Sequence, residues 1–205
     1  MASVLQTASS DAIRRIHRVQ SVTIAWMSAE AVVSLFAAWR ASSPALLAFG
    51  GDSAIELFSA IVVLWRFRAT DAHADVERRA ASVAGVLLFA LAAFVTVTSV
   101  TSLYGYSEPK PTFLGIAILV AAAVVMPWLA KEKRRLSGAT GSAALRADAA
   151  QSALCAYLSL IALVGLAINS IWHVKWADPI SALAVLPLIV WEGQKAMRGK
   201  TCGCC

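Results

Sequence analysis

Charged residues are scarce in this sequence. Asp, Glu, Lys and Arg make up 15% of the 205 residues, whereas apolar residues make up 59% and the mean hydropathy is +0.70. A soluble domain would be closer to half apolar. Several apolar runs also approach the roughly 20 residues that span a bilayer. The composition therefore argues against a soluble domain and favours an all-α, polytopic membrane protein.

Other features are missing as well. The first twenty residues lack the early apolar run of a cleaved signal peptide, so we expect residues 1–20 to form a cytosolic N-terminal segment. We find no nucleophile–base pair and no cofactor fingerprint, so we expect neither an enzyme nor a bound cofactor. The net charge is +6, but the basic residues lie at the edges of the apolar runs, so we expect no nucleic-acid partner.

Six apolar runs indicate six transmembrane helices. The runs cover residues 22–41, 44–66, 82–105, 112–130, 144–171 and 177–194. The second run begins at Pro44, a residue favoured in the first turn of a helix. We expect one transmembrane domain over 21–197 and a Cys-rich cytosolic tail over 198–205. The stretch "SGATGS" at 137–142, after the basic run "KEKRR", is predicted to be a flexible link.

Basic residues are distributed unequally between the two sides of this arrangement. Fifteen of the eighteen Lys and Arg residues fall in the N-terminal segment, in the connections after the second and fourth helices, and in the tail. The other three are Arg40, Lys110 and Lys175. Because basic residues concentrate on the cytosolic side, both termini are predicted to be cytosolic. We expect an integral protein of a bacterial inner (plasma) membrane.

Two carboxylates interrupt the second apolar run, in "GGDSAIEL". Asp52 and Glu56 are four residues apart and therefore share one helix face. A carboxylate inside the hydrocarbon region costs several kcal/mol, and two so close are not both ionised cheaply without a cation between them. This spacing favours a divalent metal, with protons as its replacement. The alternative is a pair of protonated acids that form hydrogen bonds with neighbouring helices.

The fifth apolar run carries a second polar pair, Gln151 and Cys155. At 1.5 Å per residue, Asp52 and Glu56 lie roughly 12 and 18 Å from the outer end of their helix. Gln151 and Cys155 lie roughly 10 and 16 Å from the inner end of theirs. In a core about 30 Å thick the two pairs match in depth, which predicts a four-ligand site. Taken singly, each residue has a simpler interpretation: Gln151 would form an interhelical hydrogen bond, and Cys155 would be a small apolar side chain that fills space in the core.

Four further acids lie within the predicted spans. Glu30, midway along the first run, and Asp148, one turn before the fifth-helix pair, are accessory candidates for the site. Their alternatives are an interhelical hydrogen bond for Glu30 and a structural role for Asp148, paired with Arg146 or placed at a helix end. We expect Asp178 to cap the start of the sixth helix and Glu192 to be structural.

The tail "TCGCC" holds three of the four cysteines, namely Cys202, Cys204 and Cys205. Clustered thiolates favour soft or borderline ions such as zinc, copper(I) or cadmium, so the tail is a candidate for metal capture. Palmitoylation near the membrane is the rival interpretation, and a tail without a role is the third.

The polar motifs resemble those of the cation diffusion facilitator family, whose metal site lies between the second and fifth of six transmembrane helices. "LLAFGGDSAIEL" is similar to the second-helix motif, "LRADAAQSALC" to the fifth-helix motif and "WADPISALAV" to the start of the sixth helix. The resemblance implies that Asp52 and Glu56 occupy the metal positions of the second helix. It implies that Gln151 and Cys155 occupy the His and Asp positions of the fifth, and that the protein is a homodimer.

The chain departs from the family pattern in two respects. The fifth-helix pair is Gln and Cys, which makes the donor set softer. We also expect no counterpart of the family's cytosolic C-terminal domain in these 205 residues. The paired acids, the depth-matched fifth-helix pair and the family resemblance together predict a transporter that exports a divalent cation, zinc or a softer ion, in exchange for protons. The alternative is a metal-binding membrane protein that does not transport, such as a sensor or a partner of another transporter.

Overall fold

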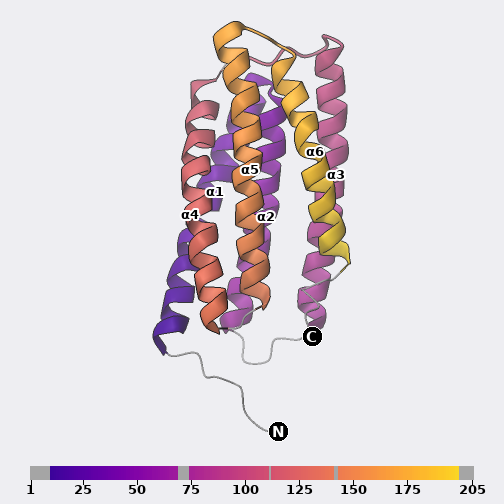
Figure 1. Ribbon diagram of the computed structural model, residues 1–205. Helices are drawn as coiled ribbons and strands as arrows, with labels where there is room; N and C mark the ends of the chain where they lie inside the picture. Colours follow the sequence, from indigo (N-terminus) through magenta and orange to yellow (C-terminus); the bar gives the residue numbers. More distant parts are fainter. Residues whose placement is uncertain (1–9, 69–73, 111, 141–142, 199–205) are drawn as a thin grey trace.

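The computed structural model describes residues 10–68, 74–110, 112–140 and 143–198. Within these ranges the chain forms helices and no strand, which confirms the all-α prediction. The six helices are α1 (Ser10–Ala41), α2 (Pro44–Arg68), α3 (Ala74–Leu103), α4 (Phe113–Thr140), α5 (Ala143–Trp172) and α6 (Ala177–Met197). They run alternately up and down, so that α1 begins and α6 ends at the same end of the bundle (Figure 1).

Helices α1 to α5 are long and apolar enough to cross a membrane. Helix α6 is not among them. It has 21 residues and includes Asp178, Glu192 and Lys195. The outer surface of the bundle carries large apolar side chains, as lipid contact requires, and they include Phe36, Phe94, Val124, Trp128 and Val164. The chain is therefore an integral membrane protein, and the sixth span stays a prediction.

Three helices extend well past their predicted limits, and one of them is α3, which begins at Ala74 and not at residue 82. Helix α1 begins at Ser10 and continues without a break to Ala41, so residues 10–20 are helical and continuous with the first predicted span. Helix α4 continues to Thr140, so the basic run and the first part of the predicted link at 137–142 are helical. Lys, Glu and Arg are good helix formers. The link prediction is wrong for 137–140 because a basic run can prolong a helix as easily as end one.

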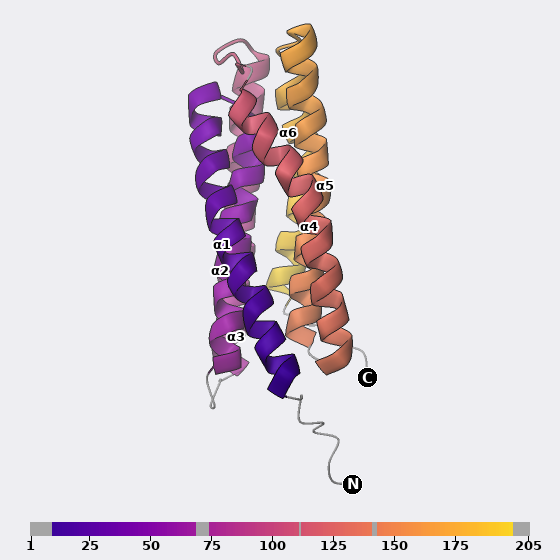
Figure 2. The same cartoon turned by 90° about the vertical axis from the view of Figure 1, so that its left-hand side faces the viewer.

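Helix α2 is the centre of the bundle and packs against α1, α3, α5 and α6. Helices α4 and α5 form one close pair and α3 and α6 another, and α1 packs across α4 (Figures 1 and 2). A Cβ atom on Gly85 of α3 would lie 3.0 Å from the carbonyl oxygen of Gly193 on α6. The small residues of the third and sixth helices therefore allow close contact within the chain.

The start of α2 is held by α6. The Ser43 hydroxyl accepts a hydrogen bond of 3.2 Å from the backbone N–H of Leu46, which caps α2. The carboxylate of Asp178 accepts hydrogen bonds from the Ser43 hydroxyl and, at 3.1 Å, from the backbone N–H of Ala45. The prediction that Asp178 caps its own helix is wrong, since the residue before α6 is Trp176 and makes no side-chain cap. Asp178 instead fixes α2 against α6.

Candidate metal site

Three of the four predicted ligands converge in the core. Asp52 and Glu56 on α2 and Cys155 on α5 each offer a ligand atom, and these atoms lie within 4.8 Å of one another. The exposed fractions of the three residues are 4%, 3% and 0%. The depth match between antiparallel helices accounts for this meeting of α2 and α5. The tail candidates Cys202, Cys204 and Cys205 lie outside the described residues.

Gln151 is placed differently from the other three. Its side chain is half-buried and lies beside the carboxyl group of Glu192 on α6. The next residue, Ser152, faces α2 and donates a 3.0 Å hydrogen bond to Glu56 Oε1. Residues three and four apart share a helix face equally well, so spacing alone does not distinguish Ser152–Cys155 from Gln151–Cys155. Glu192, expected to be structural, is buried on α6, which packs against both α2 and α5.

A buried polar network continues from Glu56 toward the end of the bundle at which α1 begins. Lys133 of α4 donates from Nζ to Ser152 Oγ at 2.8 Å and to Asp148 Oδ1 at 3.0 Å. Gln20 of α1 donates from Nε2 to Asp148 Oδ2 at 2.8 Å. Since Ser152 in turn donates to Glu56, a continuous chain of hydrogen bonds links the Lys133 ammonium to the candidate site.

Asp148 therefore forms an ion pair with Lys133, whereas the sequence suggested Arg146 as its partner. Arg146 is exposed, whereas Lys133 is fully buried. The sequence alone places Lys133 in a connection, because the basic run "KEKRR" follows an apolar span. The signal for its burial is the apolar stripe of α4, in which Lys133 follows buried Leu129 by four residues and precedes buried Leu136 by three.

Glu30 of α1 reaches the group from a third helix. It is fully buried, and its Oε1 accepts hydrogen bonds from Ser53 Oγ at 3.2 Å and from the Cys155 thiol at 3.6 Å. Ser53 lies next to Asp52 and is also 4.0 Å from Cys155 Sγ. The accessory candidate Glu30 thus contacts the residue that α5 contributes to the group.

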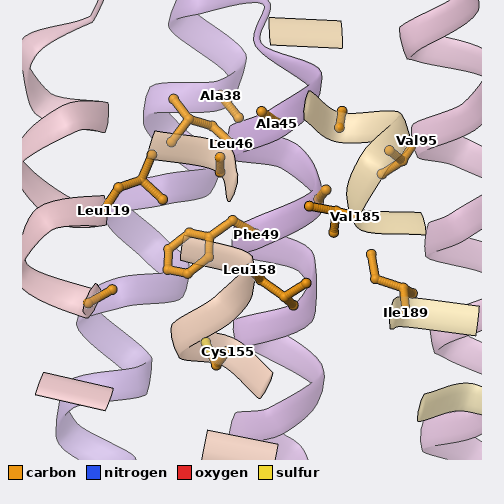
Figure 3. Packing of buried hydrophobic residues seen from close by; sticks show 14 of the residues in the cluster. Ala38, Ala45, Leu46, Phe49, Val95, Leu119, Cys155, Leu158, Val185 and Ile189 are labelled. Carbon is orange, nitrogen blue, oxygen red and sulfur yellow. The ribbon is translucent and has the colours of Figure 1, made fainter. Parts of the chain in front are cut away.

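The other end of the site is apolar. Phe49 precedes Asp52 by three residues, Leu158 follows Cys155 by three, and Leu46 lies one turn further, each no more than 1% exposed. Figure 3 shows Cys155 beyond Phe49 and Leu158, at the edge of this apolar packing. We refer to Leu46, Phe49 and Leu158 as the apolar seal. The site is therefore bordered by apolar side chains on one side and by a network of hydrogen-bonded polar side chains on the other.

Comparison with known proteins places this arrangement in a family. Residues 21–196 match the cation efflux transmembrane domain. The chain belongs to the cation efflux, or cation diffusion facilitator, family. This confirms the family resemblance of the sequence motifs.

The cation efflux protein also has a curated relative. The uncharacterized transporter sll1263 of Synechocystis is 28% identical over 165 residues, which cover 76% of this chain and 53% of that protein. The chain thus spans about half the length of this relative. The family match covers α2 to α5 completely, α1 from residue 21 onward and α6 up to residue 196, so Glu30, Asp52, Glu56 and Cys155 all lie inside the cation efflux domain.

Proposed function

We propose that this cation efflux protein exports a divalent metal cation, zinc or a softer ion, in exchange for protons. The observation that carries the proposal is the convergence of Asp52, Glu56 and Cys155 within 4.8 Å in the buried core. Buried carboxylates are costly unless a cation or proton accompanies them. Two oxygen donors and one sulfur donor form a set of intermediate softness, which suits zinc, cadmium or cobalt.

The coupling to protons follows from ligand chemistry. Carboxylates and thiols bind a metal only in their deprotonated forms, so metal binding at this site releases protons and proton return favours metal release. A site that binds metal when open to one side and protons when open to the other exchanges the two. Metal and protons are therefore the proposed substrates.

The two ends of the site support alternating access. The polar end, through Lys133 and Asp148, faces the side on which α1 begins and α6 ends, and there fifteen of the eighteen basic residues are predicted to lie. We propose that this side is the cytosol and that metal enters from it. The apolar seal then opens in the outward-facing state. We also propose a homodimer in a bacterial inner membrane, as the family resemblance implies.

Transport is tested with the full chain reconstituted in proteoliposomes. Zinc, cadmium, cobalt and manganese are offered outside vesicles with an acidic lumen, and metal uptake and lumenal pH are followed together. Metal uptake that requires the pH gradient and dissipates it supports export by proton exchange. Metal binding to the purified chain without uptake would instead support a non-transporting sensor or partner protein. Absence of both would remove the proposed function.

A further inference from the structure

We propose that Glu30 of α1 is the fourth metal ligand of the site and that Gln151 is not a ligand. The inference rests on the proposed metal site and names its donor set as Glu30, Asp52, Glu56 and Cys155. Three carboxylates and one thiolate would then come from three helices.

The first argument is the spacing of donor atoms. A tetrahedral zinc holds sulfur at about 2.3 Å and carboxylate oxygen at about 2.0 Å, which places two such donors about 3.5 Å apart. The distance between Glu30 Oε1 and Cys155 Sγ is 3.6 Å. Glu30 and Cys155 therefore already have the separation of two ligands on one metal. Glu30 lies outside the group of Asp52, Glu56 and Cys155 whose ligand atoms are within 4.8 Å of one another, so metal binding would draw its carboxyl group toward the other two carboxylates.

The second argument is an unsatisfied oxygen. Glu30 is fully buried, and its Oε2 has no hydrogen-bond partner among the residues that the structure describes. The indole N–H of Trp26, one turn earlier on α1, interacts with the same carboxyl group but does not reach hydrogen-bond geometry. A buried carboxylate oxygen without a partner is costly, and a bound cation removes that cost.

The third argument concerns Gln151. Its side chain lies beside the carboxyl group of Glu192 on α6, and Ser152 occupies the position of α5 that faces Glu56. A neutral amide oxygen is also a weaker ligand for a divalent ion than a carboxylate. The donor that the family places on α5 is thus replaced by one from α1.

The test measures zinc coordination by X-ray absorption. The full-length chain, with Cys202, Cys204 and Cys205 replaced by Ser to keep zinc off the tail, is loaded with one zinc per chain in detergent. Glu30→His and Gln151→His are compared with this parent, because a histidine bound to zinc gives a distinct imidazole scattering pattern. The parent has only three histidines, and none belongs to the proposed donor set.

We expect zinc bound to oxygen and one sulfur in the parent, an imidazole pattern in Glu30→His, and none in Gln151→His. Glu30→Gln should weaken zinc binding by more than about 100-fold, beyond the loss caused by a residue that only orients a ligand. An imidazole pattern in Gln151→His alone, or in neither variant, would overturn the inference. A pattern in both would keep Glu30 as a ligand and overturn the exclusion of Gln151.

Failure of the proposed site itself gives a different result. If Asp52→Asn binds zinc as tightly as the parent, the site between α2 and α5 is not the zinc site. If zinc binding depends on Asp52 but Glu30→His shows no imidazole, only the assignment of Glu30 fails. Elution of each variant as a single species confirms that it remains folded.

Discussion

Lys133 Nζ lies 3.0 Å from Asp148 Oδ1 inside the bundle, and the two side chains are 0% and 1% exposed. A buried ion pair adds little net stability, but removal of one partner leaves the other charge buried without compensation. Here the pair also joins α4 to α5, and Ser152 extends it to Glu56. The pair is therefore both a structural contact and the polar end of the candidate metal site.

Lys133→Met should lower the free energy of unfolding by about 3–5 kcal/mol, because Asp148 loses its counter-charge. Adding Asp148→Asn to this variant should recover much of the loss. Denaturant unfolding in detergent micelles measures both changes. The matched control is Lys175→Met, since Lys175 and Glu108 form a 2.7 Å pair with both side chains 62% exposed. That variant should change stability by less than about 1 kcal/mol. Equal losses at Lys133 and Lys175 would contradict this assignment.

Helix contact at Gly165 gives a second prediction. A Cβ atom there would overlap the Ser181 side chain on α6 and lie 3.0 Å from the carbonyl oxygen of Ala177. Gly165→Ala should therefore cost about 1–3 kcal/mol through overpacking. Gly138→Ala is the control, because nothing lies within 4 Å of its added Cβ. It should be neutral or stabilise α4 by up to about 1 kcal/mol. In thermal unfolding, Gly165→Ala should lower the midpoint temperature, whereas Gly138→Ala should leave it unchanged or raise it.

Cys155 should set the preference among metals. Cys155→Asp replaces the soft donor with a hard one, so transport should persist while the preference shifts from cadmium and zinc toward manganese and cobalt. Cys155→Ala should weaken binding of the soft metals most. Both variants are made with residues 202–205 deleted, and calorimetry and vesicle flux are measured for each metal. An unchanged order of preference in both variants would mean that Cys155 only packs.

Membrane orientation is open to direct measurement. Reporter tags at either terminus should read cytosolic, because fifteen of the eighteen basic residues are predicted on that side. A tag inserted after Lys110, between α3 and α4, should read external. The reverse result for all three positions would reverse the proposed direction of transport.

The helices were predictable from the sequence because uninterrupted apolar runs have few alternative structures. The meeting of Asp52 with Cys155 was also predictable, since antiparallel helices of known rise bring residues of equal depth together. The residue of α5 that faces Glu56 was not predictable, because Ser152 and Gln151, three and four positions before Cys155, point in similar directions. Packing against α6 separates the two, because Gln151 lies beside Glu192 of α6 while Ser152 donates to Glu56 of α2.

Lys133 shows the other limit of sequence reasoning. A basic residue beside an apolar run is typical of a membrane edge, and "KEKRR" fits that pattern. Its burial depends on Asp148 and Ser152, which belong to a different helix and become partners only when α4 and α5 pack. Asp178 is a similar case, since Asp-Pro at a helix start predicts a cap for that helix. Only the tertiary structure brings Ser43 and Ala45 to it.

The most direct test of the account is metal flux through variants of the α2 pair. Asp52→Asn and Glu56→Gln keep the shape of each side chain and remove its charge, and Glu108→Gln does the same at an exposed position away from the site. Each is reconstituted in the same vesicles, and zinc uptake is driven by the pH gradient. We predict uptake at the level of protein-free vesicles for Asp52→Asn and Glu56→Gln and normal uptake for Glu108→Gln. Normal zinc uptake by both α2 variants would contradict the proposed site.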